Sequence, residues 1–344
     1  MRDKYLDFLR FVGIMMIILA HTGSSNLIHQ IRCFDVPLML FVSGLAYGGK
    51  VIENYKKFII KRTKRLIIPC YLFLVVYFTI ALLLDNLDLI SSDISFSSVI
   101  GTFLFLDAPS IGYFWIIRVQ LLVMLVIPMI CFLSRSLKIQ VGGGTLKFVL
   151  VGIISVVVLL LDDSFNLTIL KQLSSGSLAI YILIFNTIPY VLAYSVPFFI
   201  GSVMKESSQR MNVCISVLFA LSFVIVYGYT FINKSEWPQL TPDFKYPPRM
   251  LFIIYGISVS SILWVLKPLI KKISDSKLIS FIGQNTMWIY LWHIPMIDIT
   301  IGISPFFLRY IIVTILTLVA FLLQYKAAGV LNQKSPHLVK YLIG

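Results

Sequence analysis

Two ionisable residues of one apolar segment have the types and the spacing that acid–base chemistry inside a membrane requires. Arg10 and His21 lie in the stretch 7–24, DFLRFVGIMMIILAHTGS. In a helix, eleven residues make about three turns, so both side chains leave on one face, roughly 16 Å apart along the axis. An ionisable residue in a membrane span is costly and marks a functional candidate. Because imidazole also titrates near neutral pH, the pair is the first candidate for catalysis.

Asp7 stands one turn before Arg10, at the i,i+3 spacing that lets two side chains meet. An alternative interpretation makes Arg10 and His21 anchors at the two membrane surfaces. Their separation of roughly 16 Å is short for that role, because the hydrocarbon core is about 30 Å thick. The functional interpretation is therefore preferred.

The composition is that of a polytopic membrane protein. The 344 residues are 58% hydrophobic and only 13% charged, and their mean hydropathy is +0.92. The net charge of +14 comes from basic residues in alternating loops, which fits the positive-inside rule better than nucleic-acid binding. The four cysteines show no CxxC spacing and no Cys/His cluster, so neither a metal site nor a disulfide framework is expected.

The apolar runs predict an all-α membrane helix bundle of about ten transmembrane helices, forming a single domain over residues 1–344. Basic residues fall in one set of loops and acidic residues in the other, which places both termini in the cytoplasm. A run at 98–106 is too short to cross and reads as a half-helix or an interfacial segment. The predicted spans are 7–24, 33–49, 66–84, 113–133, 148–161, 178–204, 213–232, 249–267, 279–302 and 306–325.

The two longest outer connections are expected at 85–112 and 233–248. The second, NKSEWPQLTPDFKYPP, is too rich in proline for a helix interior. The segment is predicted to be either an ordered loop that could cover the mouth of a cavity or a plain linker.

Arg62 and Arg65 share one helix face at the cytoplasmic end of the third predicted span. Arginine forks suit phosphate oxygens, so this pair could bind an anionic cofactor. The alternative is a basic stop signal that only sets topology. Seven basic residues within 50–65 favour the anion site slightly.

The stretch 34–44, FDVPLMLFVSG, favours packing over chemistry. Ser43 and Gly44 are small residues of the kind that let membrane helices approach closely. Pro37 lacks an N–H and would open the helix near the membrane surface. Asp35 lies at the outer end, where a carboxylate is often only solvated, and a catalytic role for it is the less favoured interpretation.

Further candidates lie in two aromatic stretches near the outer surface. Tyr113 and Trp115 fit an interfacial aromatic belt, although aromatic rings also stack on sugars. Arg118 lies about one turn deeper and needs an anionic or cavity-facing partner. His293, in WIYLWH, reads as a structural histidine or as a residue that contacts substrate. Arg249 and Arg309 read mainly as anchors at outer helix ends.

These stretches together resemble acyltransferase family 3, the integral-membrane acyltransferases that include many bacterial polysaccharide O-acetyltransferases. The likeness covers essentially the whole chain. Its motifs are the DFLR start with Arg-x10-His, FDVPLMLFVSG against PxFFxxSG, and Arg62-x-x-Arg65 before Leu66 and Pro69. In addition, FWII corresponds to the family pattern WF[LI], and IGQNTMWIYLWHIP corresponds to the family pattern GxxSxxIYLxHxP.

The resemblance implies acetyl-CoA as acyl donor, His21 as the central catalytic residue, Arg10 as its partner, and Arg62 with Arg65 on the acyl-CoA side. Asp35 and Met39 depart from the family pattern, and the acidic pair that often follows WF[LI] is absent, with Arg118 and Gln120 nearby. The acceptor therefore stays open, with Asp35, Tyr113, Trp115, Arg118 and His293 as its candidate residues.

The prediction is a membrane O-acyltransferase of the bacterial plasma membrane that acetylates a cell-surface glycan or its lipid-linked precursor. His21 could act as a general base on the acceptor hydroxyl or carry the acyl group covalently. A transporter or flippase is the rival, because buried Arg, His and Asp also mark substrate pathways. A third interpretation is that the protein is a structural partner within a glycan-assembly complex. No metal and no nucleic acid are expected, and a homo-oligomer is left open.

Overall fold

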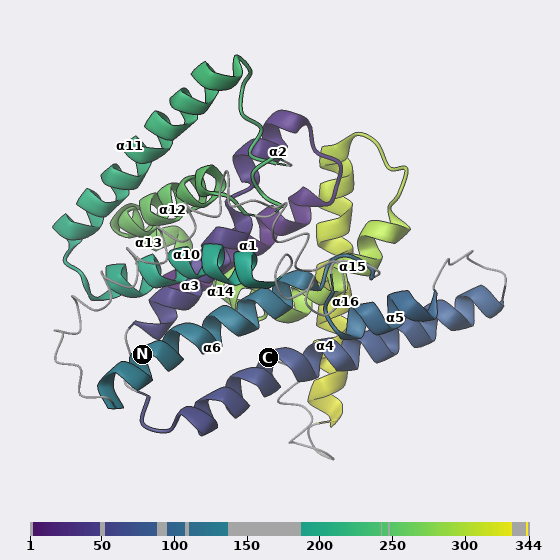
Figure 1. Ribbon diagram of the computed structural model, residues 1–344. Coiled ribbons are helices and arrows are strands. Elements are labelled where there is room, and N and C mark those ends of the chain that lie inside the picture. The colour runs from purple at the N-terminus through teal and green to yellow at the C-terminus, as the bar shows by residue number, and fades with distance from the viewer. Residues whose placement is uncertain are drawn as a thin grey trace, which may run out of the picture. The chain divides into compact units, whose positions relative to one another are not determined.

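The computed structural model describes residues 3–48, 52–87, 95–106, 110–136, 187–241, 243–246, 248–331 and 342. Among them 81% are helical, and every regular element is a helix, which confirms the all-α prediction for this part of the chain (Figure 1). The residues divide into two compact units. Unit 1 is Met1–Glu53 with Leu122–Gln284, and unit 2 is Asn54–Leu121 with Asn285–Gly344. The single domain over 1–344 stays a prediction.

Unit 1 is a bundle built around α3, which packs against α1, α10 and α12. α1 also packs against α14, and α11 lies along α12 (Figure 1). The helices are α1 (Lys4–Ala20), α2 (Asn26–Arg32), α3 (Asp35–Tyr47), α10 (Ile188–Glu206), α11 (Gln209–Lys234), α12 (Met250–Val265), α13 (Lys267–Ser274) and α14 (Lys277–Gln284).

α1 begins and ends at local signals. The Asp3 carboxylate accepts a hydrogen bond from the Tyr5 N–H and so satisfies one of the open donors of the first turn. At the other end the helix stops at Ala20, and a turn follows in which Gly23 has φ +75°. The predicted span 7–24 therefore ends four residues too late, and His21 stands at the C-cap of α1.

Two glycines let α3 and α10 touch backbone to backbone. A Cβ added to Gly44 would lie 1.7 Å from the carbonyl oxygen of Phe198. A Cβ added to Gly201 would lie 2.1 Å from the carbonyl oxygen of Phe41. The close helix packing predicted at Ser43 and Gly44 is thus confirmed for Gly44.

Unit 2 groups α15 with α4 and α16. The short α5 lies along α4, and the Tyr71 hydroxyl of α4 donates to the Phe103 carbonyl at 3.1 Å. The unit also contains the start of α6. Its helices are α4 (Tyr55–Asn86), α5 (Phe96–Phe103), α6 (Trp115–Ser136), α15 (Thr286–Ile299) and α16 (Phe306–Leu331).

Four helices in the described part of the chain are long and apolar enough to cross a membrane: α4, α10, α11 and α16. The predicted span 148–161 and the start of 178–204 lie outside the described residues, so the number of about ten stays a prediction, as do the cytoplasmic termini. One predicted span, 279–302, is wrong as a single helix, because the chain breaks between Gln284 and Thr286 into α14 and α15.

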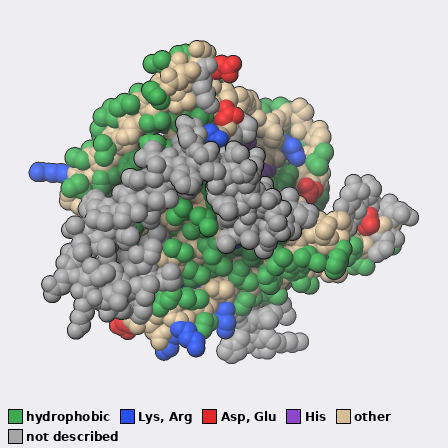
Figure 2. Space-filling view, in the orientation of Figure 1, with side chains coloured by type: hydrophobic (Ala, Val, Ile, Leu, Met, Phe, Trp, Pro, Cys, Tyr) green, Lys and Arg blue, Asp and Glu red, His purple; other side chains and the backbone are tan. Residues whose placement is uncertain are grey.

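The surface of α4 changes character along its length. Exposed basic side chains gather in its first three turns, and exposed aliphatic side chains cover the remainder (Figure 2). This division is the one expected where a helix passes from an aqueous surface into lipid. The basic residues are Lys56, Lys57, Lys61, Lys64 and Arg65, and the aliphatic residues include Val75, Val76, Ile80, Leu82 and Leu83.

Candidate functional site

The arginine of the first candidate pair is held by a buried carboxylate. Arg10 Nη1 lies 2.8 Å from Asp7 Oδ1, which confirms the contact that the i,i+3 spacing predicts. The Asp7 side chain is 0% exposed and that of Arg10 is 26% exposed. α14 approaches Asp7 closely, since a Cβ on Gly283 would lie 1.9 Å from the Asp7 carbonyl oxygen. The pair thus has one fully buried member, Asp7, and one partly exposed member, Arg10.

His21 stands at the other end of the same helix, half-buried. Its backbone N–H still bonds the Ile18 carbonyl at 3.1 Å, so the helical path continues to this residue. The rise from Arg10 therefore remains roughly 16 Å. A helix C-terminus carries partial negative charge, which stabilises a cation placed there.

Arg62 and Arg65 lie in the second and third turns of α4 rather than at its start. Arg62 is half-buried and its guanidinium lies 5.4 Å from the centre of the Phe58 ring. Arg65 is exposed, one turn further on. Their i,i+3 spacing places the two residues on one helix face, and among the described residues Arg65 has no ion pair within 4.0 Å.

Unit 2 brings Tyr113 and His293 together, as the sequence alone could not show. Their ring centres are 6.1 Å apart in an edge-to-face arrangement. The Tyr290 hydroxyl donates to the Tyr113 carbonyl, and His293 Nδ1 contacts the Tyr290 carbonyl. His293 is fully buried, so it supports this aromatic cluster from within. Trp115 and Arg118 follow, both half-buried, in the first turn of α6.

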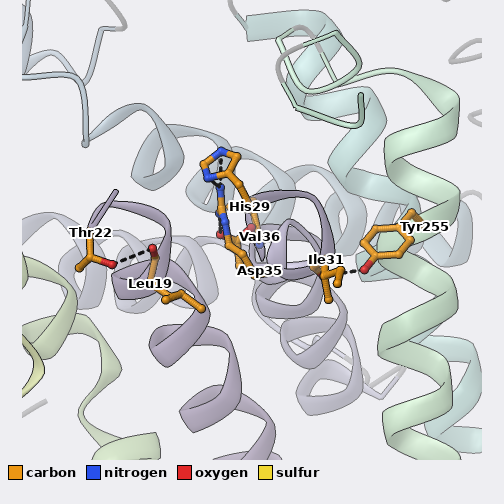
Figure 3. A network of polar contacts seen from close by, with 8 residues as sticks. Leu19, Thr22, His29, Ile31, Asp35, Val36 and Tyr255 are labelled. Carbon is orange, nitrogen blue, oxygen red and sulfur yellow. Dashed lines mark hydrogen bonds and ion pairs between the residues drawn. The ribbon is translucent and has the colours of Figure 1, made fainter. Parts of the chain in front are cut away.

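The interpretation of Asp35 as a solvated carboxylate is wrong. Its side chain is 2% exposed and its Oδ2 lies 2.5 Å from Arg32 Nη1. Arg32 Nη2 in turn contacts the ring nitrogens of His29, at 3.1 and 2.8 Å (Figure 3). The three residues are spaced i, i+3, i+6 across α2 and the start of α3. This spacing is visible in HQIRCFD, but no helix was predicted between the apolar runs 7–24 and 33–49, where the structure has α2.

In the connection 233–248, Gln239 and Thr241 bond to side chains of α2, which favours the ordered-loop interpretation over a plain linker. Gln30 donates to the Thr241 carbonyl at 2.7 Å and accepts from the Thr241 N–H at 3.1 Å. Asn26 donates to the Gln239 side chain at 2.9 Å. These contacts bring Lys245, which is 5% exposed, into the neighbourhood of His29.

The opposite end of unit 1 is basic and centred on Asp3. Its carboxylate pairs with Lys205 at 3.2 Å and with Lys267 at 2.9 Å. Both ammonium groups also lie over the Trp264 ring, at 5.3 and 5.1 Å from its centre. The lysine pairs lower the pKa of Asp3 although burial opposes them. The structure thus gathers at one end the basic residues that charge patterning assigns to one side.

Among the described residues, no group of three or more His, Cys, Asp and Glu side chains could hold a metal ion. The candidate residues therefore offer acid–base, hydrogen-bonding and anion-binding groups: an imidazole at the end of α1, an anchored arginine on the same helix, and an arginine pair on α4.

Comparison with known proteins gives one result. A family model described as an acyltransferase domain matches residues 3–325, which takes in every candidate site residue. Searches of curated proteins and of solved structures find no match. Since the family model spans nearly the whole chain and several helices are fit to cross a bilayer, the protein belongs to acyltransferase family 3 and is a multi-pass membrane acyltransferase.

Proposed function

We propose that the protein transfers an acetyl group from cytoplasmic acetyl-CoA to a hydroxyl of a cell-surface glycan, or of its lipid-linked precursor, in the bacterial plasma membrane. The observation that carries the proposal is the placement of Arg10 and His21 along one helix of a family 3 acyltransferase, with Arg10 tied to buried Asp7. Their separation of roughly 16 Å matches the need to bring a thioester from one surface toward the middle of a bilayer.

In this mechanism the anionic CoA head group binds Arg62 and Arg65, whose forks suit phosphate oxygens. We assign Arg10 to the reaction as the partner of His21, as the family resemblance implies. His21 removes the proton of the acceptor hydroxyl as its oxygen attacks the thioester carbonyl, and the C–S bond breaks as the new C–O bond forms. The CoA thiolate leaves and takes up a proton. Alternatively, the His21 ring nitrogen takes the acetyl group first and passes it to the hydroxyl.

The test uses the full-length protein in lipid nanodiscs with acetyl-CoA, and measures release of the free CoA thiol without an acceptor. The wild type should hydrolyse acetyl-CoA slowly. His21→Ala should lower the rate by about 100-fold or more, the usual effect of losing a general acid–base group. His337→Ala is the matched control, because this histidine lies beyond the residues that the family model matches. Unchanged thiol release by the His21 variant would contradict both versions of the mechanism.

The product side is tested in cells. Deleting the chain should remove base-labile acetate from surface glycans, and the wild-type chain should restore it while the His21→Ala chain should not. Movement of a glycan across the membrane without any release of CoA would instead favour the flippase reading.

A further inference from the structure

A second charged cluster of unit 1 contains more basic side chains than its own carboxylate can pair with. We name it the α2 cluster: His29, Arg32, Asp35 and Lys245. Arg32 and Asp35 are each 2% exposed and Lys245 is 5% exposed, so three of the four residues are buried. Burying a charge is expensive unless a partner of opposite charge accompanies it.

The one carboxylate of the α2 cluster is already fully used. Asp35 Oδ2 accepts from Arg32 at 2.5 Å, and Oδ1 accepts from the Val36 N–H at 2.7 Å. Among the described residues, no carboxylate lies within ion-pair distance of Lys245 Nζ, which lies 5.4 Å from the centre of the Tyr246 ring. The Arg32 Nε–H is buried and has no hydrogen-bond acceptor among the described residues. Donors from two basic side chains are therefore available for a ligand.

His29 does not change this balance of charge. Burial, and then the neighbouring Arg32 and Lys245, lower its pKa to about 4. The imidazole is therefore neutral at physiological pH. It can accept the hydrogen bond from Arg32, and it neither adds to nor offsets the excess positive charge.

The α2 cluster is also held in place before any ligand arrives. Gln30 fixes the loop that carries Lys245 through two hydrogen bonds to the Thr241 backbone. On the other side, the Tyr255 hydroxyl of α12 donates to the Ile31 carbonyl at 2.5 Å (Figure 3). Such prior ordering lowers the entropy that binding must overcome.

We propose that Arg32 and Lys245 bind an oxyanion, a phosphate or carboxylate group carried by the acceptor. The assignment to the acceptor rests on the proposed function. α2 follows directly after the turn that begins at His21, whereas Arg10 lies toward the other end of α1. If the donor arrives from the Arg10 side, the His21 end receives the acceptor. The substrate class is therefore an acidic sugar or a sugar linked through phosphate.

The experiment measures binding by calorimetry to the full-length protein in phosphatidylcholine nanodiscs. The probes are glucose 1-phosphate, glucuronate and, as the neutral control, glucose. One of the two anions should bind saturably and glucose should not. Lys245→Met, which keeps the length of the side chain, should weaken that binding at least about tenfold, as expected for loss of a charge-assisted hydrogen bond. Lys277→Met, an exposed lysine of the same unit, is the matched control and should bind as the wild type does.

Three outcomes would overturn the proposal. The first is failure of both anions to bind, and the second is equal binding by the wild type and Lys245→Met. The third is loss of sugar-anion binding when the nanodiscs contain phosphatidylglycerol, because that result would assign the site to a lipid phosphate. Thermal stability gives a further check. Lys245→Met should melt no lower than the wild type, because it removes one of two cations that share a single carboxylate. Acetyl-CoA hydrolysis measured in parallel separates the two proposals, because absent binding with His21-dependent hydrolysis rejects only this site.

Discussion

At the scale of single residues, the Asp7–Arg10 pair is asymmetric, and this asymmetry can be measured. Arg10→Gln leaves a carboxylate that is 0% exposed beside a neutral side chain, whereas Asp7→Asn leaves a guanidinium that still reaches solvent. We expect Arg10→Gln to lower the free energy of unfolding by about 3 kcal/mol. Asp7→Asn should lower it by about 1–2 kcal/mol. Denaturation of both variants in one lipid–detergent mixture makes the comparison.

The double variant Asp7→Asn/Arg10→Gln is the control for this pair. Because it removes both charges, it should recover at least about 1 kcal/mol relative to the sum of the single losses. Strict additivity would mean that the two side chains do not interact in the membrane, and the anchor interpretation of Arg10 would then regain support.

His29 makes a second residue-scale prediction, about pH. Its folded pKa of about 4 lies below the ordinary value of 6.5, so the unfolded chain binds the proton more readily between these values. Stability should therefore fall as pH drops from about 6.5 toward 4, and His29→Gln should remove part of that fall. The groups facing His29 are Arg32, Lys245 and Asp35. Melting temperatures across this range test the prediction, and a profile identical to that of the wild type would contradict it.

How far the site could be read from the sequence depended on whether a helix was recognised around each residue. Asp7 and Arg10 lie in a long apolar run, so their i,i+3 spacing had structural meaning. His29, Arg32 and Asp35 have the same spacing, but α2 has only seven residues, too few for helical periodicity to be recognised in the sequence. The partner Lys245 lies more than 200 positions away, and long-range pairing of this kind leaves no local pattern.

At the scale of elements, the contact between α3 and α10 depends on the absence of side chains. A Cβ on Gly44 would overlap the Phe198 carbonyl, and the backbone there cannot retreat without separating the helices. We expect Gly44→Ala to destabilise the protein by about 3 kcal/mol, the upper end of the range for overpacking. Gly228→Ala in α11 is the matched control, because its Cβ would meet nothing within 4 Å. It should be neutral or stabilising by up to about 1 kcal/mol.

Equal thermal stability of the two alanine variants would argue against the close contact.

The sequence predicted this close helix contact because small residues in an apolar run have few other purposes. The ends of the helices were predicted less accurately from the sequence. α4 begins eleven residues before the predicted span, since Asn54 caps a polar helical extension that hydropathy does not register. The break between α14 and α15 falls at residues 283–286, GQNT, a short polar interruption that the predicted span 279–302 passed over.

At the scale of the whole molecule, α11 offers the sharpest test of how the chain crosses the membrane. Its 26 residues rise about 39 Å, more than the roughly 30 Å of a hydrocarbon core. Large apolar side chains are exposed along its length, as lipid contact requires (Figure 2). Arg210 lies at the start of α11, near the basic end around Asp3, and Glu236 follows its last turn. The positive-inside rule therefore predicts Arg210 in the cytoplasm and Glu236 outside.

Cysteine labelling tests this predicted orientation of α11. Cys33 and Cys70 are buried, so replacing exposed Cys214, together with Cys131, by serine gives a suitable background. In intact cells, a membrane-impermeant maleimide should label Glu236→Cys but not Arg210→Cys, and permeabilised cells should show both. Labelling of both from outside would mean that α11 does not cross. The reverse pattern would place the His21 end of α1 on the cytoplasmic side, and the donor would then have to approach from the end assigned here to the acceptor.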